Sequence, residues 1–531
     1  MCILKSLNCK VLKSAVPFFN GNVDVALGKH PGSPRDIQKL LIVPTKRSWI
    51  WGHELEIFQH KACEMYIRWA ASVGPIYRLR AAFFQPDIVV VNDIIAVQYI
   101  FQNAYSYVKS PAYRPIVKRI LGKGIVYAEG EEHKHQRRLL APAFTSNAVK
   151  AMSDDIFACV DRMSQKLRTV ITSSNSTDTI VNIVPFVTAC TLDIIGRVAF
   201  GHDFGGGESK EAREIASAWH EDVLKSDTFR GFIALRLINL FPWIAKLPII
   251  AGESVSKRIV DRLAGVLLQD SHVISNAHRT DILSLLIKDN QKKGKSEVGL
   301  TDMELLDNVT TLMMVGHETS AATLVFTLLE LARNPTIQEN LRREVQTMGH
   351  LNYDRVQQLE YLDAVVKEGL RLHPAASLTE RVALQDDVIP LSNPAKTQNG
   401  DEISSLSIKA GQVFHIPFTS LNVSPEIWGQ NAAQFIPERW IKSGGIPPID
   451  KLPRGPWTGI STFCDGPRSC IGYRLAVLEL KIIVAVVVRF FELRDSGARI
   501  EEYSRPTTLQ AFSDGRAASL PLKLSSVSNE H

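Results

Sequence analysis

A cysteine in a glycine-rich loop is the residue of this sequence with the clearest chemical potential. The stretch 463–472 reads FCDGPRSCIG, and an apolar helical run from Leu475 to Phe491 follows it. Gly466 and Gly472 allow a tight turn that presents the sulfur of Cys470. Backbone N–H groups and the positive end of the following helix favour a thiolate there. A single thiolate on such a loop suits axial ligation of haem iron.

Two other interpretations of this cysteine are open. An isolated cysteine is more often a small buried apolar residue than a ligand. Cys464, in the same stretch, suggests a disulfide or a zinc pair. No Cys-x-x-Cys or Cys/His spacing supports zinc, however.

The pattern Phe-x-x-Gly-x-Arg-x-Cys-x-Gly in this stretch resembles the haem-binding loop of the cytochrome P450 family, and every defining position is filled. Gly466 and Gly472 occupy the family's glycine positions. The resemblance implies that Cys470 is the axial ligand of the haem iron, that Arg468 meets a haem propionate, and that Phe463 packs near the sulfur. It also implies haem b, iron protoporphyrin IX, as the cofactor.

A second stretch with chemical potential lies inside a predicted helix from Thr301 to Arg333, which opens with a capping box. Its segment 315–320 reads VGHETS and resembles the family's oxygen-activation motif, with a valine as a departure at the first position. A mid-helix glycine costs about 1 kcal/mol relative to alanine, so Gly316 indicates a use.

By this resemblance Gly316 opens a groove for dioxygen, Thr319 hydrogen-bonds dioxygen and an ordered water, and Glu318 relays protons from solvent. Delivered protons are what make cleavage of the O–O bond feasible. The alternative for Thr319 is a hydroxyl bonded back to a carbonyl of its own helix.

Three further residues resemble the family's propionate-binding positions. A charged helix begins at Gly130, where the family pattern is Trp-x-x-x-Arg; this chain has His133 at the tryptophan position and Arg137 at the arginine position. Arg381, on a predicted strand after Pro374, matches a further propionate-binding arginine. The alternative for the charged helix is a solvated surface face.

Glu368 and Arg371 lie three residues apart on one predicted helical face, followed by Pro374. Glu-x-x-Arg alone is a common match, but the family buries this pair and joins it to an arginine, here Arg439 of Pro-Glu-Arg-Trp. Buried ion triads are poor stabilisers, yet they can specify a unique packing. We therefore interpret these three residues as structural support for the cysteine loop.

The composition indicates an ordinary globular protein of 531 residues, 45% hydrophobic and 22% charged. Seven cysteines without regular spacing do not form a disulfide framework. The net charge of +6 is spread along the chain, so nucleic acid is not indicated as a partner. The resemblance implies a mainly α fold with a small β-rich part, the cytochrome P450 fold. Haem would lie between the long helix and the cysteine loop.

We predict three parts of the chain: an N-terminal segment at residues 1–69 with no clear transmembrane helix, a haem domain at 70–524 and a polar tail at 525–531. Residues 229–252 are apolar but interrupted by basic residues and a proline. Such a segment could lie on a membrane, or form a buried helix pair. By family analogy the expected location is the endoplasmic reticulum membrane, on its cytosolic face.

The function that the resemblance implies is a monooxygenase that oxidises an apolar small molecule with dioxygen. No flavin or dinucleotide motif is visible, so electrons are expected from a separate NADPH-dependent flavoprotein reductase. The motifs look like those of filamentous-fungal relatives, often found in terpenoid or other secondary-metabolite pathways.

Two alternatives remain. One is a haem-thiolate isomerase or dehydratase that needs no reductase, against which the acid–alcohol pair Glu318-Thr319 argues. The other is a non-catalytic haem-binding protein.

Overall fold

The computed structural model describes residues 41–527 except for 46, 112, 175–177, 227, 242, 245–246, 248–251, 274–280, 285, 288–298 and 505–507. Most of the predicted N-terminal segment and the last four residues of the predicted tail lie outside the described residues. The described helices are α1 (Glu54–Gln59), α2 (Glu64–Val73), α3 (Ile94–Gln102), α4 (Arg114–Leu121), α5 (Gly130–Leu140), α6 (Ser146–Ala151), α7 (Ser153–Ser173), α8 (Val184–Phe200), α9 (Lys210–Ser226), α10 (Phe229–Leu240), α12 (Val255–Val273), α14 (Asp302–Arg333), α15 (Pro335–Thr347), α16 (Tyr353–Gln358), α17 (Glu360–Leu372), α18 (Phe418–Asn422), α19 (Pro425–Trp428) and α20 (Tyr473–Phe490).

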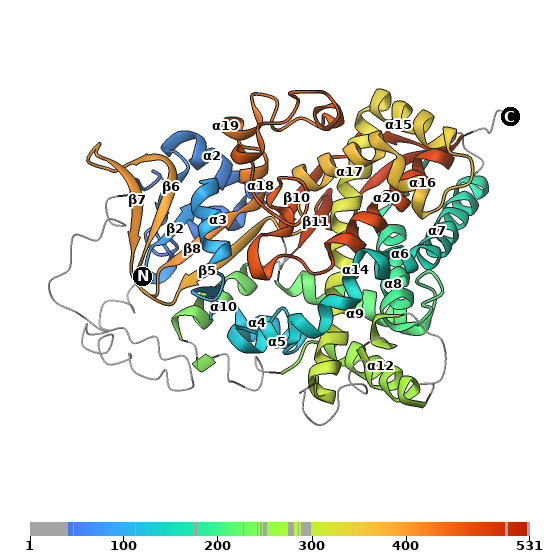
Figure 1. Ribbon diagram of the computed structural model, residues 1–531, viewed down its shortest axis with the longest axis horizontal. Coiled ribbons are helices and arrows are strands. Elements are labelled where there is room, and N and C mark those ends of the chain that lie inside the picture. Colours follow the sequence, from blue (N-terminus) through green and yellow to red (C-terminus); the bar gives the residue numbers. More distant parts are fainter. Residues whose placement is uncertain are drawn as a thin grey trace.

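The strands are short and form four small sheets within the described residues. They are β1 (Ile76–Leu79), β2 (Ile88–Val91), β3 (Tyr107–Lys109), β4 (Thr179–Asn182), β5 (Leu378–Ala383), β6 (Asp387–Lys396), β7 (Glu402–Ile408), β8 (Val413–Pro417), β9 (Phe491–Asp495), β10 (Ile500–Ser504), β11 (Leu509–Ser513), β12 (Arg516–Ala517) and β13 (Pro521–Ser526). The largest sheet has the order β1-β2-β8-β5-β3. Its strands gather at one end of the molecule, whereas α7, α8, α12 and α15 occupy the other end (Figure 1).

The central element is α14, which packs against α8, α12, α17 and α20 (Figure 1). It begins at the predicted capping box, in which the Thr301 hydroxyl accepts from the Glu304 N–H and the Glu304 carboxylate accepts from the Thr301 N–H. Within the described residues α14 is also the one helix long and apolar enough to cross a membrane, but 78% of that apolar window is buried. Its apolar side chains therefore form the core of the helical part.

The predicted boundary between residues 69 and 70 falls inside α2. Tyr66 and Trp69 on this helix are buried against β1 and β2, where they form a small separate core. The first described residues thus pack as part of the β-rich end. At the other terminus, residues 525 and 526 of the predicted tail belong to β13, which pairs with β9.

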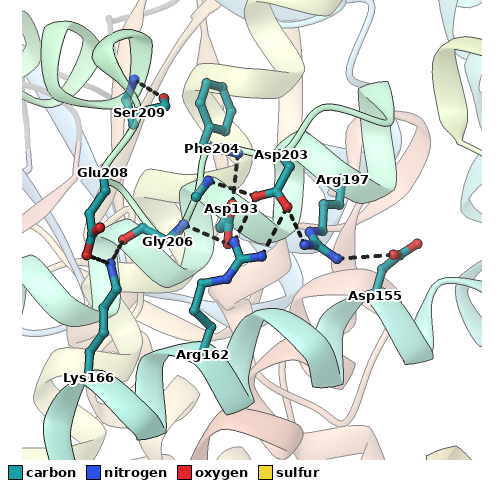
Figure 2. A network of polar contacts seen from close by, with 12 residues as sticks. Asp155, Arg162, Lys166, Asp193, Arg197, Asp203, Phe204, Gly206, Glu208 and Ser209 are labelled. Atoms are coloured by element: carbon teal, nitrogen blue, oxygen red, sulfur yellow. Dashed lines mark hydrogen bonds and ion pairs between the residues drawn. The ribbon is translucent and has the colours of Figure 1, made fainter. Parts of the chain in front are cut away.

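An ionic network around the buried Asp193 holds α7 to α8 and to the loop that follows α8 (Figure 2). Arg162 of α7 donates to the carboxylates of Asp193, on α8, and Asp203, in the loop, at 2.7 Å each. Asp193 also accepts from the backbone N–H groups of Phe204 and Gly206. Burial raises the pKa of Asp193, whereas the hydrogen bond from Arg162 lowers that of Asp203. The network fixes α8, the helix that lies directly against the middle of α14.

Candidate active site

The cysteine loop runs through two 3₁₀ turns, η8 (Ser461–Phe463) and η9 (Gly466–Arg468), into the start of α20. The Cys470 N–H donates to the Phe463 carbonyl at 2.8 Å, which closes the loop. Gly466 has a φ of +68°, and a Cβ there would lie 2.2 Å from the carbonyl oxygen of Phe101. Both conditions require glycine at this position. The loop is therefore seated on the last turn of α3.

The buried ion triad lies behind this loop. Glu368 of α17 binds Arg371 and Arg439 at 2.8 Å each, and all three side chains are buried. Arg371 also donates to the carbonyl of Asn422 at 2.6 Å. The Asn422 side chain in turn accepts from the backbone N–H of Ser461 at 2.9 Å, at the start of η8. The triad is thus linked through one asparagine to the turn that precedes the cysteine.

The sequence predicted surroundings that favour a thiolate at Cys470, and the structure differs from this prediction. Its side chain is exposed to solvent, although many protein atoms lie around it. Burial raises the pKa of the Cys470 thiol to about 11, although a backbone hydrogen bond from Gly472 and the charge of Arg137 act in the opposite direction. Desolvation of the sulfur therefore outweighs the helix start that the sequence emphasised. A bound metal cation would reverse this balance, because a coordinating thiol is deprotonated.

Phe463 is buried beside the loop, with its ring 6.0 Å from that of Tyr473 and 6.1 Å from that of Trp457. These two aromatic rings hold the Phe463 side chain in the apolar packing beside the cysteine loop.

Three predicted arginines lie around the loop. Arg137 of α5 donates to the carbonyl oxygen of Ser469 at 2.5 Å, one residue before the cysteine. Arg468 pairs with Glu129 at 2.5 Å, while its buried Nε has no hydrogen-bond partner among the residues that the structure describes. Arg381, buried on β5, donates to the Thr379 hydroxyl and to the carbonyl of Glu380.

The sequence did not single out Lys109, which belongs to the same group. Lys109 on β3 is the register partner of Arg381 on β5, and its ammonium donates to the carbonyl of Val126. Burial, together with the charges of Arg468 and Arg381, lowers the pKa of Lys109 to about 7. No motif marks this lysine, because its role becomes visible only when β3 pairs with β5.

His133 is buried next to these cations. Its Nδ1 lies 3.2 Å from the hydroxyl of Tyr105. Burial, together with the charges of Arg468, Lys109 and Arg137, lowers the pKa of His133 to about 3. The imidazole is therefore neutral and can act as a hydrogen-bond donor, which is not the behaviour of a solvated helix face.

These cations form what we call the cationic cluster: Lys109, Arg137, Arg381 and Arg468. Among the described residues, Glu129 is the one carboxylate that forms an ion pair with it. Buried cations without enough counter-charge are unfavourable. Two propionates of a haem beside Cys470 would supply two negative charges, and the unpartnered Nε of Arg468 would gain an acceptor. The residues present therefore fit haem.

The predicted oxygen-activation segment lies in the middle of α14. The Thr319 hydroxyl donates to the carbonyl of Val315 at 2.9 Å, which is the geometry of the back-bonded alternative. The Glu318 carboxylate accepts from the side-chain amide of Gln510 on β11 at 2.6 Å. The two side chains thus have separate partners in this structure.

The packing of α14 against α8 explains the glycine at position 316, which the sequence alone did not reveal. A Cβ at this position would lie 2.8 Å from both Cγ1 and Cδ1 of Ile195 on α8. The missing side chain therefore lets α14 approach α8, and this contact alone accounts for a small residue. The groove for dioxygen stays a prediction.

Comparison with known proteins agrees with this geometry. The family model described as Cytochrome P450 matches residues 43–511, so the chain belongs to the cytochrome P450 family. Among its relatives, cytochrome P450 monooxygenases claP and claO of Ampulloclitocybe clavipes are each 29% identical, over 82% and 86% of both chains respectively. Cytochrome P450 monooxygenase 128 of Postia placenta is 29% identical over 87% of both chains.

Membership of this family confirms several predictions. The fold is the mainly α cytochrome P450 fold with a small β-rich part, the cofactor is haem, and the relatives are fungal monooxygenases, which makes the chain an oxidoreductase. Members of the family normally work with a redox partner and a substrate.

Proposed function

We propose that this chain is a haem-thiolate monooxygenase that oxidises an apolar small molecule, with Cys470 as the axial ligand of the iron. The observation that carries the proposal is the cationic cluster, four buried or part-buried cations gathered beside the cysteine loop. When bound, thiolate-ligated haem supplies the activation of dioxygen. The chain's own residues bind and orient the haem and move protons.

The propionates would be held by Arg137, Arg381, Arg468 and neutral His133, as the family resemblance implies, and Lys109 joins them. Arg137 donates to the Ser469 carbonyl, next to the cysteine that would ligate the iron. Phe463, Gly466 and Gly472 shape the loop itself, and Glu368, Arg371 and Arg439 support it from behind.

Proton delivery is assigned to Glu318 and Thr319. The Thr319 hydroxyl would exchange its bond to the Val315 carbonyl for one to dioxygen or an ordered water, and Glu318 would pass protons from solvent. Gly316 would leave room beside them.

The proposed electron donor is an NADPH-dependent flavoprotein reductase, and the proposed substrate is a fungal secondary metabolite such as a terpenoid. What supports the proposal is that the relatives are named cytochrome P450 monooxygenases and come from fungi, and that members of this family normally work with a redox partner. No observation favours the isomerase, dehydratase or non-catalytic alternatives.

A membrane contact on the cytosolic face of the endoplasmic reticulum is part of the proposal. In the predicted segment 229–252, Trp243 is 60% exposed and Phe229 is 48% exposed. Trp49 and Phe84, exposed by 79% and 71%, extend this apolar surface. Trp51 packs on Phe229 at 5.8 Å and so joins the two segments. Exposed tryptophan and phenylalanine side chains are typical of surfaces that enter the headgroup region of a bilayer.

The test of the proposed activity is turnover of a panel of apolar substrates by the purified haem protein with a fungal reductase and NADPH. The proposal expects an oxygenated product whose new oxygen atom comes from ¹⁸O₂ and which disappears when the reductase is omitted. Product that forms without the reductase would contradict it and favour the isomerase or dehydratase alternative.

A further inference from the structure

A glutamine on β11 binds the carboxylate that the proposed function uses for protons. The side-chain amide of Gln510 donates to Oε1 of Glu318 at 2.6 Å and lies 3.4 Å from the hydroxyl of Thr508. Gln510 is placed there by the pairing of β11 with β10 and by the packing of β11 against α14. This bond joins two segments of the chain that lie 192 residues apart.

The other polar neighbour of Glu318 cannot replace this donor. Nδ1 of buried His317 lies 2.8 Å from the carbonyl of Met313, and a carbonyl can only accept, so Nδ1 carries the proton. The other ring nitrogen, Nε2, lies 3.6 Å from Oε2 of Glu318, which is longer than a hydrogen bond. Among the described residues, Gln510 is therefore the side chain that donates a hydrogen bond to Glu318.

Glu318 is only 7% exposed, so its carboxylate depends on protein partners rather than on bulk water. Loss of a hydrogen bond to a buried charged group leaves that group free to turn toward other donors. The neighbouring Thr319 points to the backbone of its own helix and offers no such bond in this structure. The orientation of Glu318 is thus set from β11.

We propose that Gln510 is a positioning residue for proton delivery: its amide holds the Glu318 carboxylate on the β11 side of α14, from where Glu318 accepts a proton from water and passes it on toward Thr319. Glu318 returns to the carboxylate after each transfer, so the relay is balanced and needs no other reactant. This inference rests on the proposed monooxygenase function.

The test compares Gln510→Leu, Glu318→Gln and the double variant at equal haem content. We expect Gln510→Leu to lower product formed per NADPH by about tenfold, less than the roughly 10²–10⁴-fold that a full acid–base group contributes. The solvent isotope effect should move toward that of Glu318→Gln. In the Glu318→Gln background, adding Gln510→Leu should not lower product per NADPH any further.

An equal loss in both backgrounds, or an increase in KM with unchanged product per NADPH, would mean that Gln510 contacts substrate and would overturn the proposal. The matched control is Ser513→Ala, on the same strand but outside this bond, which should leave product per NADPH unchanged. A loss in the control equal to that in Gln510→Leu would overturn the proposal as well.

A second readout does not depend on activity. Glu318→Leu and Gln510→Leu should lower the Tm together by less than the sum of their separate effects, because both remove the same bond. Additive effects would contradict the bond. If the wild type makes no oxygenated product, the proposed function fails and this melting comparison still reports on the bond. If the wild type is active and Gln510→Leu forms as much product per NADPH as the wild type, only the proposed role of Gln510 is contradicted.

Discussion

Lys109 and Arg381 face each other as register partners on the antiparallel strands β3 and β5, in the interior of the protein. Like charges directly opposite on a sheet are destabilising, and burial adds to that cost. Burial lowers the pKa of both side chains, which shows that their surroundings do not compensate the charge. Such a pair is understandable if the site normally holds an anionic group, as two haem propionates would be.

The first prediction concerns Lys109→Met. Below about pH 7 the folded apoprotein must carry a charged lysine at a cost that the unfolded chain does not have, because the pKa falls from 10.5 to about 7 on folding. We therefore expect the variant to raise the Tm of the apoprotein at pH 6. Haem should dissociate about tenfold faster, since one charge-assisted hydrogen bond contributes roughly 1.5–3 kcal/mol.

The comparison uses apoprotein melting and transfer of haem to an acceptor globin. Lys118→Met, on the exposed side of α4, is the matched control and should change neither. A lower apoprotein Tm together with unchanged haem dissociation would contradict a role for Lys109 in this site.

The second prediction separates packing from chemistry at Gly316. In Gly316→Ala the new methyl group contacts Ile195, and such overpacking destabilises a protein by about 1–3 kcal/mol. The better helix propensity of alanine offsets about 1 kcal/mol of this loss. We expect a modest loss of stability in Gly316→Ala. Ile195→Ala removes a buried side chain and is itself destabilising, but in that background Gly316→Ala should cost little or nothing further. Melting curves of the four proteins check this. Unchanged Tm with lost dioxygen binding would instead support the groove.

The third prediction concerns pH and His373, which lies between Glu502 and Glu330 at 3.1 and 3.3 Å. Burial alone would lower the pKa of His373, but the two carboxylates outweigh it and raise the pKa to about 9. A pKa raised above the unfolded value of 6.5 gives stability that is complete below pH 6.5 and is lost as pH rises to about 9. The loss should be on the order of 3 kcal/mol.

Urea unfolding of wild type and His373→Gln between pH 6 and pH 9.5 measures this difference. The wild type should lose its advantage over the variant as pH rises. A constant difference across that range would show that the imidazole is not protonated in the folded state.

The fourth prediction concerns Thr319→Ala. Without the hydroxyl, the proposed proton path loses its last donor, so we expect product per NADPH to fall by about tenfold and hydrogen peroxide to rise. Water that enters the space limits the loss. Ser320→Ala is the matched control, because the adjacent Ser320 hydrogen-bonds Glu479 on α20 instead. Wild-type coupling in Thr319→Ala would leave only the back-bonded interpretation of this threonine.

The sequence predicted the parts of the site that depend on short spacing. The cysteine loop, the capping box at Thr301 and the pair Glu368 and Arg371 are each defined within a few residues, so local geometry brings their members together. The strands that carry Arg381 and the helix that carries Arg137 also lie where the resemblance implied.

The remaining features depend on contacts between distant segments. Lys109 becomes part of the site only through the pairing of β3 with β5, and Gln510 reaches Glu318 only because β11 packs on α14. Ile195 explains Gly316 through contact between two helices. The raised pKa of the Cys470 thiol has the same origin, because desolvation is set by the whole fold rather than by the helix that follows the loop.

The most direct test of the central claim is the optical spectrum of the dithionite-reduced, CO-bound protein, recorded beside Cys470→Ala and Cys470→His. Thiolate ligation by Cys470 predicts a strongly red-shifted Soret band in the wild type that is absent from both variants. A wild type without haem, a band typical of histidine ligation, or a red-shifted band that survives in Cys470→Ala would contradict the assignment.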